Sequence, residues 1–205
     1  MKNKKNKITI IILSIIAILF IALTILVCLG LTKNIDKSVY DFIISFRNNI
    51  LDTYFKGITR LGDPTMIIIL LCLCVVLIRG KNIFYLSLST ALSALFNQII
   101  KHIVQRPRPD ELRLIYQGGY SYPSGHSMIS ICFYGFLFYY VYKYVKNKYI
   151  KTILLLLLSI IIISIPISRI YVGVHYFSDV IGGLLLGGFI LIIVIKYGNK
   201  LIRGN

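Results

Sequence analysis

The stretch from Ser168 to Asp179 combines three residue types whose side chains can do chemistry together. Arg169 offers a planar cation, His175 an imidazole, and Asp179 a carboxylate four residues after that imidazole. A charged group at membrane depth costs on the order of 2.5 to 3.5 kcal/mol unless it lines a polar cavity or finds a partner. Three polar groups within twelve residues, between two apolar runs, therefore predict a functional site.

Two further segments supply cations and a turn that suit an anion. Lys101 and Arg108, together with Arg169, can surround a dianionic phosphate, since each Arg presents a planar fork and Lys a point charge. In the turn after Pro123, Ser124 adds a hydroxyl donor and Gly125 lets the backbone approach closely. The helix that begins there would aim free N–H groups at the anion.

The two histidines predict different roles in phosphoryl transfer. If a helix begins near His175, Asp179 lies one turn further on the same face. The carboxylate can then accept from one ring nitrogen and leave the other free to attack phosphorus. His126 has no carboxylate at that spacing, so it is left to protonate the departing oxygen.

Each candidate residue taken alone also has a simpler interpretation. Arg169 and Asp179 can pair across a loop, Lys101 and Arg108 can anchor the chain at the membrane interface, and His126 can cap a helix. These interpretations do not explain why all the candidates fall at the same ends of the predicted spans.

Composition and apolar runs predict an all-α polytopic membrane protein. The chain has 205 residues, 57% of them hydrophobic, and a mean hydropathy of +0.81. Some runs are shorter than the roughly 20 residues that a bilayer core requires, but Lys, Arg and Tyr at their ends can snorkel to the interface. Six transmembrane helices are expected, at Ile8 to Leu31, Leu61 to Ile78, Asn82 to Ile100, His126 to Val145, Thr152 to Ile167 and Val180 to Ile195.

Charge distribution predicts the orientation of these helices. The net charge is +16, and all seven acidic residues fall on one side of the predicted layout. An excess of Lys and Arg marks the cytoplasmic side, so both termini are expected there and the candidate site on the extracytoplasmic face. The cytoplasmic segments hold thirteen cations and no acid: Lys2, Lys4, Lys5, Lys7, Arg79, Lys81, Lys143, Lys146, Lys148, Lys151, Lys196, Lys200 and Arg203.

The same basic residues do not predict a nucleic-acid partner. Lys and Arg near an anionic lipid surface each contribute about 1 kcal/mol of attraction, which explains the excess. The loops contain no basic groove interleaved with aromatic residues. The four cysteines lie inside apolar runs at spacings that match neither a zinc site nor a redox pair.

Between the first two spans, apolar residues from Ile35 to Ile58 recur every three to four positions with charges between them. This periodicity predicts one amphipathic helix lying on the outer surface, where it caps the bundle or lines a path for lipid. The break at Gly62-Asp63-Pro64 then starts the second span. We expect a single domain over residues 1–205, with its motifs at 101–179.

Three motifs in this chain resemble the signature of a known family. Lys101 is followed after six residues by Arg108-Pro109; the turn reads Pro123-Ser124-Gly125-His126; and Ser168-Arg169 precedes His175 and Asp179 at intervals of five and three residues. This triple pattern is similar to that of the type 2 phosphatidic acid phosphatase superfamily. The superfamily contains the lipid phosphate phosphatases and is related to the vanadium-dependent haloperoxidases.

The resemblance implies a role for each candidate residue. It makes His175 the nucleophile that forms a phosphohistidine, His126 the general acid and Asp179 the residue that orients His175. It implies no metal and no cofactor. Arg106-Pro107 repeats the Arg-Pro pattern, but the spacing from Lys101 selects Arg108, and whether Arg106 assists it is left open. The implied phosphate ligands are Lys101, Arg108, Ser124, Gly125 and Arg169.

The sequence therefore predicts a bacterial phosphatase of the plasma membrane that acts on a lipid phosphate at the outer leaflet. Phosphatidylglycerophosphate and undecaprenyl pyrophosphate are the preferred substrates, ahead of phosphatidic acid. No obligate protein partner is inferred. Two alternatives remain open: a non-catalytic binder or carrier of lipid phosphates, and a haloperoxidase that binds vanadate in the same cradle.

Overall fold

The computed structural model describes residues 2–78, 80–110 and 112–202, and within them the chain forms helices and no strands. Arg79, Glu111 and Arg203, which entered the charge analysis, lie outside the described residues. The helices are α1 Lys2–Cys28, α2 Lys33–Ile44, α3 Asn49–Thr59, α4 Pro64–Leu77, α5 Lys81–Val104, α6 Gly125–Ile129, α7 Phe136–Tyr144, α8 Lys148–Tyr171 and α9 Phe177–Ile202.

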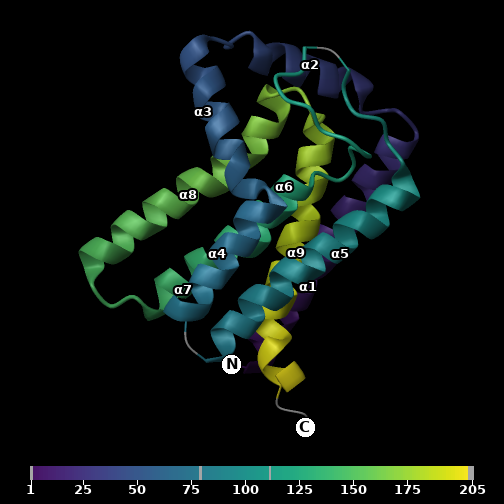
Figure 1. The fold of residues 1–205 in the computed structure, drawn as a ribbon. Helices are drawn as coiled ribbons and strands as arrows, with labels where there is room; N and C mark the ends of the chain where they lie inside the picture. The colour runs from purple at the N-terminus through teal and green to yellow at the C-terminus, as the bar shows by residue number, and fades with distance from the viewer. Residues whose placement is uncertain (1, 79, 111, 203–205) are drawn as a thin grey trace.

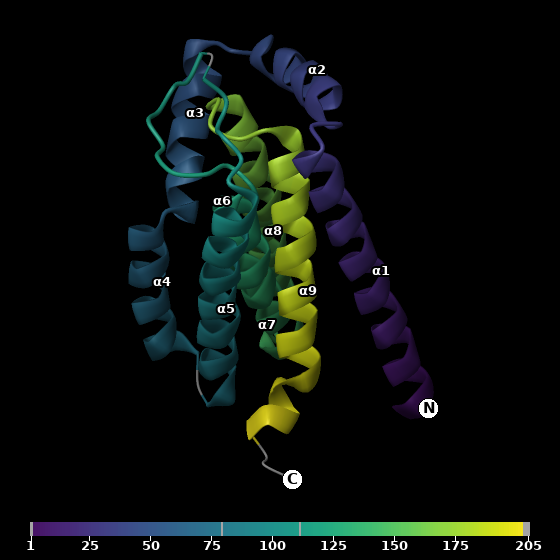
Figure 2. The ribbon, with the colours of Figure 1, turned by 90° about the vertical axis from the view of Figure 1, so that its right-hand side faces the viewer.

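Helices α1 and α5 run along α9, whereas the N-terminal part of α8 slants away from them, and the first and last described residues lie at the same end of the bundle (Figure 1). Helix α2 and the loop of residues 105–124 cover the opposite end (Figure 2). In the described part of the chain, four helices are long and apolar enough to cross a membrane, and a fifth span results if α3 and α4 count as one bent span. The chain is a multi-pass membrane protein.

The predicted apolar runs correspond to helices, with shifted ends. Helix α8 continues four residues beyond the predicted Ile167 and carries Arg169 in its last turn. The predicted span from His126 to Val145 corresponds to α6, a π-helical segment Ser130–Gly135 and α7 in direct succession. The six-span count remains a prediction, because this interrupted run is not among the spans that length and composition identify in the described residues.

The single amphipathic helix predicted from Ile35 to Ile58 is wrong, because the structure has two helices there. Helix α2 ends at Ile44, and Asn48 begins α3 by accepting hydrogen bonds from the backbone N–H groups of Ile50 and Leu51. Asn is a preferred residue at this position because its side chain satisfies free N–H groups of the first turn. Helix α3 continues toward α4 across a 60° bend at residue 63.

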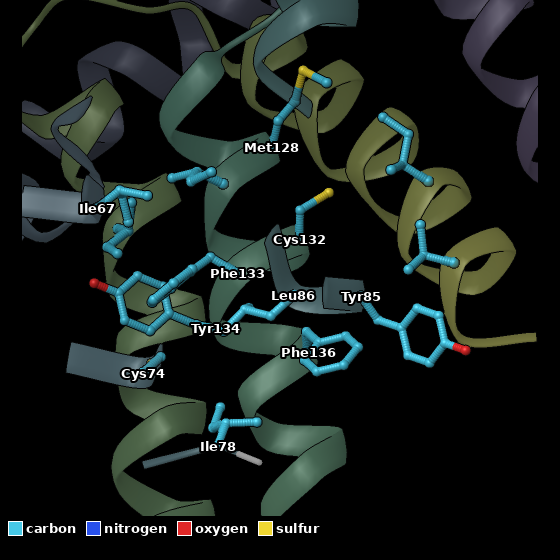
Figure 3. Close-up of a cluster of buried hydrophobic side chains, with 14 of the residues drawn as sticks. Ile67, Cys74, Ile78, Tyr85, Leu86, Met128, Cys132, Phe133, Tyr134 and Phe136 are labelled. Carbon is cyan, nitrogen blue, oxygen red and sulfur yellow. The ribbon is translucent and has the colours of Figure 1, made fainter. Parts of the chain in front are cut away.

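A hydrophobic core holds the central helices together on the side of the bundle away from α2. Figure 3 shows side chains of α4, α5 and the run from α6 to α7 gathered in one cluster, which includes Met128, Cys132 and Phe133. These three side chains are completely buried. The close packing fixes the relative positions of the helix ends that carry the predicted site.

Glycines on α9 bring the fourth helical run close to it. A methyl group on Gly183 would lie 2.5 Å from the carbonyl oxygen of Ser124, which is nearer than real contacts allow. Small residues permit this close approach of helix backbones in membranes. The backbone N–H of Ser124 donates to the carbonyl of Asp179 at 2.9 Å. The predicted phosphate-binding turn at Ser124 and the first turn of α9, which carries Asp179, are thus held side by side.

Candidate active site

A cavity of about 560 Å³ brings together six of the eight residues predicted from the sequence. Its polar end is lined by residues from α5, the following loop, α6, α8 and the loop between α8 and α9. The six are Lys101, Arg108, Gly125, His126, Arg169 and His175.

His175 lies in the loop before α9 and is held by two partners on opposite sides of its ring. Its Nδ1 lies 3.3 Å from Oδ2 of Asp179, and its Nε2 lies 2.9 Å from Nη1 of Arg108. A guanidinium only donates hydrogen bonds, so Nε2 must be the nitrogen with the lone pair and Nδ1 the one that carries the proton. The nitrogen that faces Arg108 is therefore the one with the free lone pair.

Burial and nearby cations keep this imidazole neutral. Burial lowers the pKa of His175 well below its usual value, and the charges of Arg108 and Arg169 act in the same direction. Burial also lowers the pKa of Arg108, to about 10, which leaves the guanidinium charged at neutral pH.

This shift predicts how stability depends on pH. In the unfolded chain His175 takes up a proton near its ordinary pKa of about 6.5, whereas in the folded protein it does so only at lower pH. Between these two pKa values the unfolded chain carries a proton on His175 that the folded protein lacks. The free energy of unfolding therefore falls as the pH falls from about 6.5 toward the folded-state pKa. We expect the melting temperature in detergent to drop less between pH 7 and pH 5 in His175→Gln than in the wild type. Equal slopes would contradict this assignment.

Arg169 is almost completely buried at the end of α8. Its Nη1 donates to Oγ1 of Thr59 at 2.6 Å, and its Nη2 donates to Oε1 of Gln117 at 2.9 Å. Its Nε has no hydrogen-bond partner within the described residues. A buried donor of this kind lacks compensation for lost water, so it favours an anion in the cavity. The pairing of Arg169 with Asp179 that remained open from the sequence does not occur.

Asp179 instead pairs with Arg106, the residue whose role beside Arg108 was left open by the sequence. Nη1 of Arg106 lies 2.6 Å from Oδ1 of Asp179, and Nη2 lies 2.7 Å from Oδ2 of Asp36 on α2. Asp36 also accepts from the backbone and hydroxyl of Ser178. Arg106 lines a second cavity, of about 730 Å³ beside α2, which shares Arg108 with the first, and it contacts Asp179 on the side away from His175.

Ser124 does not line the cavity. It is completely buried, and its hydroxyl accepts from the backbone N–H of Ser127 as the cap of α6. Its role as a phosphate ligand stays a prediction. Gly125 does line the cavity, and a methyl group there would lie 3.0 Å from Oδ1 of Asn97.

His126 has a carboxylate partner that spacing along the helix did not reveal. Its Nε2 lies 3.0 Å from Oδ1 of Asp63, in the bend between α3 and α4. Thr59, Asp63 and Gln117 are thus contacts of the site that the sequence analysis missed. The available signal was Asp63 itself, an acidic residue placed directly before an apolar run.

The architecture is that of a helical membrane protein with two histidines and three cations in one cavity, and the chain belongs to the PAP2 superfamily. The family profile matches residues 82–203. This stretch contains all three motifs.

Two proteins with similar sequences are named as lipid phosphatases. The chain is 28% identical over 180 residues to phosphatidylglycerophosphatase B of Bacillus subtilis (strain 168), covering 83% of this chain and 87% of that protein. It is 27% identical over 167 residues to lipid phosphate phosphatase delta of Arabidopsis thaliana, covering 76% of this chain and 40% of that protein.

Two crystal structures share the fold. The transmembrane PAP2-type phosphatidylglycerolphosphate phosphatase from Bacillus subtilis matches with a TM-score of 0.83 and 25% identity, covering 94% of this chain and 98% of that one. Aquifex aeolicus LpxE matches with a TM-score of 0.64 and 27% identity, covering 78% of this chain and 94% of that one.

Proposed function

We propose that this protein is an integral membrane phosphatase that hydrolyses a lipid phosphate through a phosphohistidine intermediate on His175. The observation that carries the proposal is the position of His175, whose Nδ1 contacts Asp179 and whose Nε2 contacts Arg108, in a cavity also lined by Lys101, Arg169 and His126. A nucleophile, an acid and a set of cations in one cavity are what phosphoryl transfer requires.

The reaction follows from these positions. When the substrate's phosphate binds, the guanidinium of Arg108 moves from Nε2 of His175 to the phosphate oxygens. Nε2 then attacks phosphorus, while Lys101, Arg108 and Arg169 stabilise the negative charge on the equatorial oxygens. The bond from phosphorus to the lipid oxygen breaks, and His126 gives its proton to that oxygen. Water, deprotonated by His126, then attacks the phosphohistidine and releases phosphate, which returns both histidines to their starting states.

A lipid substrate is supported by the rest of the cavity. Beyond the polar end, the cavity continues between α4 and α5, where Ile67, Ile68 and Leu71 face Ala91 and Ala94. An apolar region next to an anion-binding end suits a lipid with a phosphorylated headgroup. The relative from Bacillus subtilis is named for phosphatidylglycerophosphate, so we propose this lipid as the first substrate, ahead of undecaprenyl pyrophosphate and phosphatidic acid.

We further propose that the protein lies in the plasma membrane of a bacterium with both termini in the cytoplasm and the site at the outer face. Support comes from the Lys-rich ends of the chain and from the position of the first and last described residues opposite α2 and the site loop (Figure 2). A site at this depth reaches a headgroup while the lipid stays in the outer leaflet.

Phosphate release from purified protein in mixed micelles tests the proposal. We expect turnover of phosphatidylglycerophosphate, and we expect it to persist in EDTA, because Lys101, Arg108 and Arg169 supply the positive charge that a metal would otherwise provide. Loss of turnover in EDTA would overturn the metal-independent route. Binding of the lipids without phosphate release would favour the carrier, and peroxide-dependent halide oxidation with vanadate would favour the haloperoxidase.

A further inference from the structure

The bend between α3 and α4 supplies the carboxylate that contacts His126. Asp63 stands directly before Pro64 at the start of α4, where an Asp side chain ordinarily accepts from free N–H groups of the first turn. Here it makes no such capping bond, and its Oδ1 lies 3.0 Å from Nε2 of His126 instead. The carboxylate of Asp63 therefore contacts His126 and does not cap α4.

The bend is also shaped to the ring of His126. A methyl group on Gly62 would lie 2.5 Å from Cδ2 of His126, so the imidazole rests directly on the glycine backbone. The hydroxyl of Tyr134 donates to the carbonyl of Leu61 at 2.8 Å and ties the bend to the helical run that carries His126. These contacts fix the ring and the carboxylate relative to each other.

The surrounding charges explain why such a partner is needed. Lys101, Arg108 and Arg169 line the same cavity as His126, and their charges oppose a further positive charge on its imidazole. A general acid must hold a proton when the leaving group departs. Asp63, with 47% of its side chain exposed, is a negative charge in direct contact with His126 and connects it to solvent.

We propose that Asp63 is a positioning residue that keeps His126 oriented and protonated for its role as general acid. The proposal rests on the phosphatase function above. In the step concerned, the phosphorus–oxygen bond breaks, its electron pair goes to the lipid oxygen, and the proton of His126 goes to the same oxygen. The water that attacks the phosphohistidine returns a proton to His126, whose charged form the carboxylate of Asp63 then stabilises.

Two substrates with different leaving groups test this role. An alkyl phosphate of a lipid needs a protonated leaving group, whereas p-nitrophenyl phosphate releases a phenolate that needs no proton. In Asp63→Asn we expect kcat for phosphatidylglycerophosphate to fall about 100-fold, the low end for general acid catalysis, with little change in KM. For p-nitrophenyl phosphate we expect the first-turnover release of p-nitrophenolate to change by less than about threefold, because attack by His175 is untouched and the step that needs His126 as a base comes only afterwards.

The pH profile and matched variants complete the test. The basic limb of the kcat profile, where the acid loses its proton, should move to lower pH in Asp63→Asn, and Asp63→Glu should recover part of the lost kcat. Asp41→Asn removes an acid of similar exposure on α2 and should leave both substrates unaffected.

Equal losses on both substrates with an unmoved basic limb would overturn the proposal and leave Asp63 a structural residue. Unchanged kcat on phosphatidylglycerophosphate would overturn it as well. A wild-type protein that releases phosphate from neither substrate would contradict the phosphatase function itself, which is a separate result.

Discussion

Replacing His175 by Ala is expected to lower turnover of phosphatidylglycerophosphate by at least about 10⁴-fold. Removal of a catalytic nucleophile leaves only the contribution of binding and charge stabilisation, and such losses reach on the order of 10⁶-fold. The cations would still hold the phosphate, so KM should change far less than kcat. Phosphate release in mixed micelles under saturating substrate measures the effect.

The matched control is His102→Ala. His102 is exposed on α5 next to Lys101, and its Nδ1 contacts the carbonyl oxygen of Gln98. Its loss should leave turnover near the wild-type value. Residual activity above about a tenth in His175→Ala would show that another group attacks phosphorus.

Replacing Arg106 by Gln is expected to destabilise the protein by about 3 to 5 kcal/mol, the effect of breaking a buried ion pair by removing one partner. Arg106 neutralises Asp36 and Asp179, whose side chains are 1% and 0% exposed. Although burial opposes its charge, the carboxylates of Asp179 and Asp36 raise the pKa of Arg106. Without this cation two buried carboxylates remain close together, and Asp179 also loses a contact that orients it.

Unfolding of purified protein in mixed micelles with increasing denaturing detergent measures this change. Arg113→Gln is the control, because Arg113 pairs with an Asp110 that is 91% exposed, and such pairs contribute about 0 to 1 kcal/mol. Adding Asp36→Asn to Arg106→Gln should restore part of the stability, since one buried charge is removed. If Arg106→Gln and Arg113→Gln lowered the free energy of unfolding by similar amounts, the stabilising role of the Arg106 ion pairs with Asp36 and Asp179 would be contradicted.

The helices and the polar end of the cavity could be predicted because each rests on local pattern. Each predicted apolar run overlaps a helix or a run of helices, with ends shifted by up to seven residues, since water-free surroundings require continuous apolar helices. The spacing of Arg108 from Lys101 selected the arginine that the structure places against His175. The predicted span ended at Ile167, before the charged Arg169, whereas α8 ends at Tyr171. Arg has a high helix propensity, so a buried Arg169 that points into a polar cavity does not end the helix.

The remaining contacts could not be predicted because their partners are distant in sequence. Arg106 meets Asp36 across 70 residues and His126 meets Asp63 across 63, so no helical spacing relates them. The break between α2 and α3 escaped because the apolar periodicity continues through it. The local signal for the break was Asn48, a residue type that often begins a helix, and the prediction of a single amphipathic helix did not use it.

The central claim is that phosphate passes through His175, and trapping the intermediate tests it most directly. Wild-type protein turning over phosphatidylglycerophosphate labelled with ³²P in the terminal phosphate is denatured rapidly at alkaline pH, where phosphohistidine survives, and its peptides are identified. Label is expected on the peptide that contains His175 in the wild type, and no labelled peptide is expected in His175→Ala. Turnover without labelled protein, or label that persists in His175→Ala, would contradict it.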